Sequence, residues 1–146
     1  MKQNEFNFQT SYGYHFISIS IGIKRLMESR LKPYNLTHLQ FSILMYLYRK
    51  PATTQKEMLK HIYGDEASVT RLIDRLEQKG YLKRVPCAKD KRKKNILLTS
   101  QGIALTKEMM QYALEVNREL TAELSQEEAD ELLRLLQKVH IAIDTI

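Results

Sequence analysis

Apolar residues recur at helical spacing along most of this chain, and the pattern predicts a largely helical protein. A first helix is expected over residues 12–32, because proline at position 33 disfavours helical backbone in the residue before it. This helix has two apolar stripes, one formed by Phe16, Ile19, Ile23 and Leu26 and a second that includes Ile17 and Ile21. A helix that is apolar on two sides is usually buried between two partners.

Helix-capping signals predict three further helices in the segment that follows. The segments 37–49 and 54–62 each open with Thr and carry Gln or Glu three residues later, which is the pattern of a capping box. The segment 65–80 opens with Asp, a favoured N-cap, and ends with a glycine, which is typical after a helix C-terminus. The sequence therefore predicts a compact three-helix unit, with a tight turn at Tyr63 and Gly64 before its last helix.

The periodicity then changes to that of strands. Residues 81–85 and 96–99 predict two short strands, joined by the loop 86–95. After Gly102 the helical spacing returns, on a face that carries Met109, Ala113, Val116 and Leu120. A capping box at Ser125 opens a last helix, whose apolar face carries Leu132, Leu136, Val139 and Ile143. The expected fold class is mainly α with one small β-hairpin, in a chain of 146 residues that suits one domain.

The net charge of +6 is concentrated in one short segment. Residues 81–95 contain seven Lys or Arg and one acid, whereas residues 100–146 contain four basic and nine acidic residues. This distribution indicates a contact surface for a polyanion near the hairpin, and the acidic last third is not expected to lie on it. No signal peptide or membrane span is apparent, and the single Cys87 excludes an internal disulfide, so a cytoplasmic location is expected.

The helix over 65–80 is the most informative element. Its narrow apolar face consists of Val69, Leu72, Ile73 and Leu76. Small residues in its first turn let such a helix enter the major groove, where Arg71 and Arg75 would reach phosphates or a guanine edge. The alternative is an ordinary amphipathic helix with a solvated polar face. Asp74 counts against DNA contact unless it pairs with Arg71, Arg75 or Gln78.

A short helix, a tight turn, a second helix and a basic hairpin follow one another in the order of a winged helix-turn-helix. The hairpin tip suits a narrow minor groove, where the negative potential attracts Lys and Arg. A solvated charge run that keeps the hairpin edge soluble is the alternative. Seven basic residues directly after a candidate recognition helix favour DNA. The residues expected to touch it are Thr54, Gln55, Ala67, Ser68, Thr70, Arg71, Arg75, Lys89, Asp90, Lys91, Arg92, Lys93 and Lys94.

Three stretches carry a family resemblance: residues 68–82 (Ser-Val-Thr-Arg-Leu-Ile-Asp-Arg-Leu-Glu-Gln-Lys-Gly-Tyr-Leu), the hairpin triplet Asp-Lys-Arg at 90–92, and the closing residues 98–102. With residues 36–41, they resemble the multiple-antibiotic-resistance regulator (MarR) family of bacterial winged-helix proteins. The resemblance implies a winged helix-turn-helix over 36–99. It further implies that long helices within 1–35 and 100–146 interlock in a homodimer, which binds a pseudo-palindromic operator.

The resemblance also implies roles for single residues. The family's Asp-x-Arg wing pattern falls on Asp90 and Arg92, so that the acid orients an arginine that enters the minor groove; Lys91 stands where relatives often have a second arginine. Glu66 lies in a turn that departs from the family pattern and would be unfavourable near phosphates. The family often binds small aromatic ligands in a crevice between the winged and dimerisation regions, and the side chains expected to line it are Tyr12, His15, Tyr34, His38, Tyr46 and Tyr48. The alternative is that these residues belong simply to the core.

Cysteine and histidine chemistry is weakly supported. Cys87 lies at the base of the hairpin near Arg84 and Lys89, whose charges are expected to lower the thiol pKa, but a redox role is not favoured. No two of the four histidines have the spacing of a helical metal site, and His61 is separated from Asp65 by a glycine turn. Neither a metal nor a cofactor is therefore expected.

The favoured hypothesis is a sequence-specific transcriptional regulator, a repressor that binds its operator as a homodimer and is released by a small-molecule ligand or by a change of state. The alternative is a winged-helix module that docks a protein partner through the same surface and has no operator. An enzyme is disfavoured, because the sequence has no nucleophile–base pairing, glycine-rich phosphate loop or metal-ligand spacing.

Overall fold

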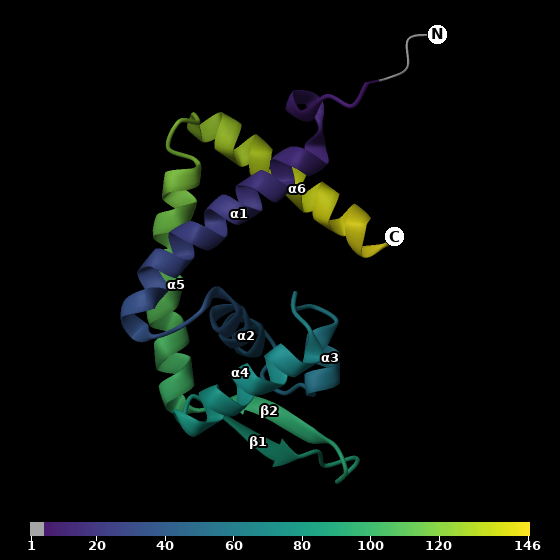
Figure 1. The fold of residues 1–146 in the computed structure, drawn as a ribbon, viewed down its shortest axis with the longest axis vertical. Coiled ribbons are helices and arrows are strands. Elements are labelled where there is room, and N and C mark those ends of the chain that lie inside the picture. Colours follow the sequence, from purple (N-terminus) through teal and green to yellow (C-terminus); the bar gives the residue numbers. More distant parts are fainter. Residues whose placement is uncertain (1–4) are drawn as a thin grey trace. The chain divides into compact units, whose positions relative to one another are not determined.

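The computed structural model describes residues 5–146, which form a mainly helical fold with one β-hairpin, as the sequence predicts (Figure 1). The helices are α1 (Tyr12–Leu31), α2 (His38–Arg49), α3 (Gln55–Leu59), α4 (Glu66–Gln78), α5 (Ser100–Leu120) and α6 (Gln126–Asp144). The strands are β1 (Leu82–Pro86) and β2 (Lys94–Leu98), and the short 3-10 helices are η1 (Phe8–Thr10) and η2 (Lys32–Tyr34). The chain divides into two compact units, one that ends at Tyr112 and one from Ala113 to Ile146.

The first unit has a core built from α2, α4 and the hairpin. α2 packs against α4 and β2, and α4 packs against β1. α4 buries Val69, Ile73 and Leu76 completely, because these residues share one face of the helix. α2 adds to the core Phe41, Ile43, Leu44 and Leu47. The core therefore holds α4 by one face and leaves the opposite face exposed.

The predicted helix starts are confirmed with their caps. Thr37 and Gln40 form a complete capping box at α2, and Ser125 and Glu128 form another at α6. The Asp65 carboxylate caps α4 by accepting a hydrogen bond from the Ser68 backbone N–H at 2.8 Å. Side chains close in sequence make these caps, which is why local pattern predicts them well.

α3 keeps its predicted N-cap, Thr54, but lacks the rest of the capping box and ends early. Thr54 Oγ1 accepts from the Glu57 N–H at 3.2 Å, but the Glu57 carboxylate does not complete a capping box and contacts Lys60 and His61 instead. The helix ends at Leu59, three residues before the predicted end. The next two backbone N–H groups bond to carbonyls three residues back, so the chain tightens into a turn.

The two strands pair antiparallel, with Leu82 opposite Leu98. β1 begins one residue later and β2 two residues earlier than predicted, so the loop between them is 87–93. Ile96 also donates its backbone N–H to the Thr53 carbonyl at 2.7 Å, in an isolated antiparallel bridge. This bridge ties the segment before α3 to the hairpin.

Two glycines shape the chain around the hairpin. Gly80 has φ 83°, in the left-handed region, and ends α4 as predicted. α5 begins at Ser100 and so contains Gly102, which was expected to precede it. The Thr99 hydroxyl accepts from the Gly102 N–H at 3.1 Å, and a Cβ on Gly102 would lie 1.9 Å from the Tyr81 carbonyl oxygen. This glycine therefore permits a close backbone approach and is not a helix breaker.

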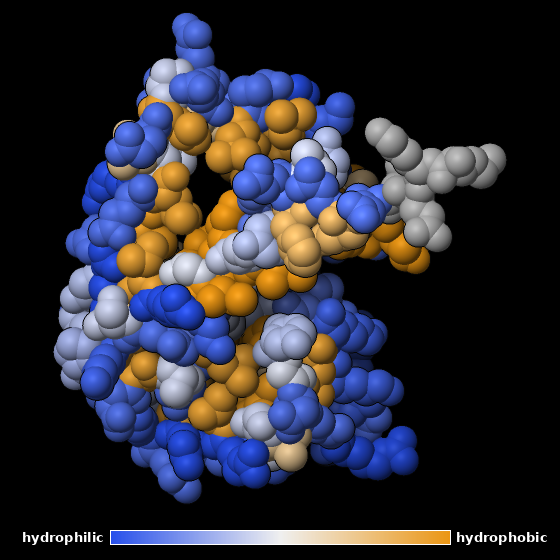
Figure 2. Space-filling model, turned by 45° about the horizontal axis from the view of Figure 1, so that its top comes forward, coloured by the Kyte–Doolittle hydropathy of each residue, from blue (hydrophilic) through white to orange (hydrophobic). Residues whose placement is uncertain are grey.

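α1 and α6, each taken by itself, keep apolar faces exposed. In α1 the only buried residues are Met27 and Leu31, so burial between two partners does not occur within the single chain. Apolar side chains of α1 that are 41–64% exposed are Phe16, Ile17, Ile19 and Ile21. α6 buries none of its residues. Figure 2 shows hydrophobic residues, in orange, at the surface of the molecule. No helix in the described part of the chain is long and apolar enough to cross a membrane.

Candidate nucleic-acid interface

The residues predicted to touch DNA lie on three elements of the first unit: the start of α3, helix α4 and the hairpin. On α4, Ala67, Arg71 and Arg75 are exposed and Ser68 and Thr70 are half-buried. These positions lie away from the buried face, so the core fixes the helix and presents them on one side. The structure thus brings together the predicted residues of α4.

Polar groups in the first turn of α4 are already hydrogen-bonded to one another. The Ser68 hydroxyl donates to Asp65 Oδ2 at 2.7 Å and accepts from an Arg71 guanidinium N–H at 3.3 Å. Hydrogen bonds from the Ser68 backbone and side chain lower the pKa of the Asp65 carboxyl. Asp65 is therefore a cap that holds this turn together, while Glu66 beside it is exposed.

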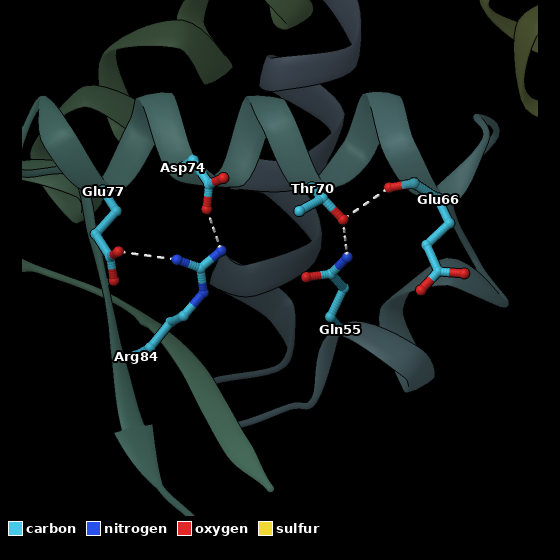
Figure 3. Close-up of polar contacts among 6 residues, drawn as sticks. All are labelled: Gln55, Glu66, Thr70, Asp74, Glu77 and Arg84. Carbon is cyan, nitrogen blue, oxygen red and sulfur yellow. Dashed lines mark hydrogen bonds and ion pairs between the residues drawn. The ribbon is translucent and has the colours of Figure 1, made fainter.

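A second polar chain links α3 to α4 (Figure 3). Gln55 Nε2 donates to Thr70 Oγ1 at 2.5 Å, and the Thr70 hydroxyl donates to the Glu66 carbonyl at 2.8 Å. Gln55 and Thr70 were both predicted to contact DNA, but their partnership was not foreseen. Fifteen residues separate them, and nothing in the local pattern pairs them.

Arg84 of β1 joins the hairpin to α4 (Figure 3). Its guanidinium lies 2.6 Å from Asp74 Oδ1 and 2.8 Å from Glu77 Oε1, and its side chain is 22% exposed. Asp74 therefore has a cationic partner, although not one of the three that the sequence analysis considered. Because two acids neutralise Arg84, its charge is not available to a polyanion in the way that the charge count implied.

The hairpin loop 87–93 carries an arginine supported by an aspartate. The Asp90 carboxylate accepts from the backbone N–H of Arg92 at 3.1 Å and from its Nε at 3.3 Å. The Arg92 side chain is 92% exposed, whereas that of Asp90 is 32% exposed. The lysines of this hairpin that were predicted to contact DNA are all exposed: Lys89, Lys91, Lys93 and Lys94. The pairing implied by the Asp-x-Arg pattern is present, and it leaves the guanidinium in solvent.

Cys87 lies where the loop leaves β1. Its backbone N–H donates to the Lys93 carbonyl at 2.8 Å, which closes the loop. Hydrogen bonds from the backbone N–H groups of Lys89 and Asp90 lower the pKa of the Cys87 thiol. The expected direction is therefore confirmed, but the main cause is the backbone of the loop and not the charges of Arg84 and Lys89.

A cleft of about 390 Å³ opens between the start of α3 and the hairpin. Its lining is rich in cations and consists of Thr54, Gln55, Lys56, Arg84, Arg92, Lys93, Lys94 and Ile96. Lys56 was not among the predicted contacts, although it follows Gln55 directly in the sequence. The bridge between Thr53 and Ile96 places it beside the wing, which only the tertiary structure reveals.

Four of the six residues predicted to line a ligand crevice have separate partners: Tyr34, His15, His38 and Tyr46. The Tyr34 hydroxyl lies 2.7 Å from the Glu108 carboxylate and 2.8 Å from the Tyr112 hydroxyl, and these hydrogen bonds raise the pKa of the Tyr34 phenol. Tyr46 stacks on His61, with ring centroids 5.7 Å apart. In the part of the chain that the structure describes, no ring pair joins two of the six residues.

The remaining predicted crevice residues differ in exposure. Tyr12 is 84% exposed and Tyr48 is 38% exposed. His15 Nε2 lies 2.8 Å from the Gln9 carbonyl oxygen. Burial lowers the pKa of the half-buried His38, and the charge of Lys24 acts in the same direction.

Comparison with known proteins decides the family. A sequence model of the MarR family matches residues 36–94. The HTH-type transcriptional regulator PecS of Dickeya dadantii (strain 3937) is 32% identical over 124 residues, which cover 83% of this chain and 75% of PecS. The chain belongs to the MarR family.

Solved MarR-family structures agree with this fold. Wild-type MarR from E. coli in its apo form superposes with a TM-score of 0.82 at 31% identity, over 88% of this chain and 96% of that one. A MarR mutant from E. coli complexed with operator DNA has a TM-score of 0.77 at 30% identity, over 94% and 99% of the two chains. The S. aureus MepR–DNA complex has a TM-score of 0.75 at 30% identity, over 90% and 98%. The chain thus has the fold of the MarR winged-helix proteins, with the hairpin of β1 and β2 as its wing.

Proposed function

We propose that this MarR-family chain is a transcriptional regulator, a repressor that binds a pseudo-palindromic operator as a homodimer. In this proposal α4 enters the major groove and the wing enters the adjacent minor groove. Residues 36–99 form the DNA-binding region, and the helices within 1–35 and 100–146 form the dimerisation region. The MarR and MepR relatives solved with DNA support this assignment.

The observation that carries the proposal is the arrangement of Arg92. The Asp90 carboxylate accepts hydrogen bonds from the backbone N–H and the Nε–H of Arg92. The Arg92 side chain nevertheless remains almost fully exposed among the wing lysines. An exposed arginine held at the tip of a basic hairpin suits a narrow minor groove, where the negative potential is strongest. The neighbouring cleft between the wing and α3 adds Lys56, which suits a backbone phosphate.

The proposal of a homodimer rests on the apolar faces of α1 and α6. Each face consists of residues at helical spacing that the single chain leaves exposed, such as Ile17 at 64% and Ile143 at 64%. Large exposed apolar surfaces are uncommon in monomers and mark interaction sites. A second copy of the chain offers the same faces, and two-fold symmetry suits a pseudo-palindromic site.

Selection from random DNA with the purified full-length protein is the direct test. Enrichment of an inverted repeat is the expected result. The logarithm of the operator affinity should also fall linearly with the logarithm of the salt concentration, because each neutralised phosphate releases counterions. Failure to enrich any sequence would overturn the proposal and favour a winged-helix module that docks a protein partner.

Substitution of Arg92 tests the wing. Arg92→Ala should weaken operator binding by about tenfold to a hundredfold and lower the salt slope by about one per wing, while the melting temperature stays unchanged. Lys107→Ala is a matched control, because it removes one exposed positive charge of α5 outside the predicted contacts. Equal operator affinities for the two variants would show that the wing is assigned wrongly.

We further propose that a small aromatic or phenolic ligand releases the operator. The support is the contact between the aromatic rings of Tyr34 in η2 and Tyr112 in α5, whose centroids lie 5.9 Å apart. A panel of phenols and aromatic carboxylates should include a compound that raises the operator dissociation constant, and Tyr34→Phe should change that response. A panel without effect on operator binding counts against ligand release but leaves DNA binding in place.

A further inference from the structure

The hydroxyl groups in the first turns of α4 already donate hydrogen bonds to other groups of the protein. A hydroxyl has a single hydrogen to donate. The Asp65 carboxylate, which only accepts, takes the hydrogen of Ser68 at 2.7 Å. Thr70 Oγ1 has two polar neighbours: it donates its hydrogen to the Glu66 carbonyl at 2.8 Å, and it accepts from Gln55 Nε2 at 2.5 Å.

The geometry fixes the orientation of this network. The Glu66 carbonyl only accepts, so the Thr70 hydroxyl donates to it and must accept from the Gln55 amide N–H. Figure 3 shows the Thr70 oxygen directed toward both partners and its methyl group directed away from them. Thr70 is half-buried, so part of its side chain remains exposed. What Thr70 offers an incoming ligand is therefore mainly its methyl group.

Ala67 offers a second methyl group nearby. It lies three residues before Thr70, a spacing that places two side chains next to each other on a helix, and it is exposed. Methyl groups of Ala and Thr recognise the C5-methyl group of thymine in the major groove, whereas the other bases lack that group. We propose that α4 selects thymine through the methyl groups of Thr70 and Ala67, and not through hydroxyl hydrogen bonds. This inference rests on the proposed function, since it requires α4 in a major groove.

Gln55 acts in this arrangement as a positioning residue. Its amide N–H bonds to Thr70 Oγ1 and so helps to hold the threonine in the rotamer that turns the methyl group away from α3. The bond also connects the start of α3 to α4, because the two residues belong to different helices. Gln55→Leu should therefore reduce thymine selectivity less than removal of the Thr70 methyl group itself.

Replacement of thymine by deoxyuridine tests the proposal directly, because it removes only the C5-methyl group and keeps all base pairing. Each thymine of the operator enriched from random DNA is replaced in turn, and binding is measured by fluorescence anisotropy at fixed salt. At one or two thymines in each half-site the affinity should fall about fourfold, the factor that corresponds to one buried methyl group. Equal affinity at every position would overturn the proposal.

Two variants of Thr70 separate the methyl group from the hydroxyl. Thr70→Ser keeps the hydroxyl and should abolish the preference for thymine over uracil at one operator position. Thr70→Val keeps a methyl group and loses the hydroxyl, and it should retain that preference. The reverse outcome, with selectivity lost in Thr70→Val and kept in Thr70→Ser, would contradict the proposal. Unchanged melting temperatures and an unchanged salt slope show that the fold and the phosphate contacts remain intact.

The two proposals fail in different ways. Absence of any enriched DNA sequence would remove the proposed function and this inference together. If an operator is enriched but replacing any of its thymines by uracil leaves the affinity unchanged, the proposed function stands. Only the proposal that α4 recognises thymine methyl groups is then overturned.

Discussion

α4 and α6 have the same kind of apolar stripe but different surroundings. α4 places Val69, Ile73 and Leu76 completely inside the first unit. α6 buries no residue, and its stripe residues Leu136 and Val139 are 37% and 46% exposed. A stripe at helical spacing therefore indicates a face suited to an apolar partner, but it does not show whether that partner belongs to the same chain.

The polar faces of the two helices differ as well. On α4, polar groups connect to other elements, through Gln55 of α3 and Arg84 of β1 (Figure 3). On α6, the polar contacts that the structure shows are local, such as the ion pair between Arg134 and Glu131. α4 is thus positioned by tertiary contacts on both faces, as an element must be if it is to present side chains accurately to a partner.

The largest expected effect concerns the apolar face of α6. Leu136→Glu should separate the proposed dimer, because a carboxylate cannot be buried there without a partner, and operator affinity should fall on the order of a hundredfold or more. Analytical ultracentrifugation and anisotropy measure the two effects. Lys138→Glu places the same acid on the opposite side of α6 and should leave the dimer intact. A dimer that survives Leu136→Glu would mean that α6 is not at the interface.

The next effect concerns the buried face of α4. Leu76→Ala should lower the free energy of unfolding by about 3 kcal/mol, because it leaves a cavity in a fully buried site. Urea denaturation measures the loss, and Gln78→Ala on the exposed side of α4 is the control. In contrast to Leu136→Glu, the loss should persist at every protein concentration. A loss that disappears at high protein concentration would contradict the distinction between the two helices.

A smaller effect is expected at the link between the wing and α4. Arg84→Met keeps much of the side-chain volume but removes both ion pairs, and it should reduce the free energy of unfolding by about 1 kcal/mol, since both acids are partly solvated. A double-mutant cycle with Asp74→Asn isolates the pairwise part of this effect. Strictly additive losses in the cycle would show that the ion pair with Asp74 does not stabilise the fold.

The smallest effect is a pH dependence at the start of α4. The folded pKa of Asp65 is lowered, so the carboxylate contributes stability that is present above its unfolded pKa and is lost as the pH falls below about 4. Asp65→Asn keeps an N-cap but cannot ionise. The difference in melting temperature between the wild type and this variant should therefore narrow between pH 7 and pH 3. A difference that is constant over this range would contradict the role of the charge.

Sequence reasoning predicted most of the elements, because their signals are local. The capping boxes of α2 and α6, the Asp65 cap and the C-terminal Gly80 all involve residues within four positions of one another. The Asp90–Arg92 contact is local too, and it agrees with the pattern in the sequence. Local signals misplaced the start of α5, because Gly102 is required by the distant Tyr81 carbonyl.

The hydrophobic and polar pattern of the sequence did not predict contacts between different elements. The partners of Arg84 lie seven and ten residues away on another element, and those of Gln55 and Tyr34 are farther still. A charge count treats Arg84 as a free cation and Asp74 as an obstacle, whereas the packing of β1 on α4 brings the two together. The same limit applies to Lys56, which a bridge between Thr53 and Ile96 places in a cleft beside the wing.

The sequence by itself determined the order of the elements, the stripe that α4 buries and the concentration of positive charge in the wing, because periodicity, caps and charge are local properties. Only the tertiary structure decided which polar groups of α4 remain available. The hydroxyl groups of Ser68 and Thr70 donate their hydrogens to other groups of the protein, and Asp74 forms an ion pair with Arg84. The physical reason is that a hydroxyl has one hydrogen to donate. The fold of α4 gives the hydrogens of Ser68 and Thr70 to Asp65 and Glu66, and the packing of β1 on α4 brings Arg84 to Asp74.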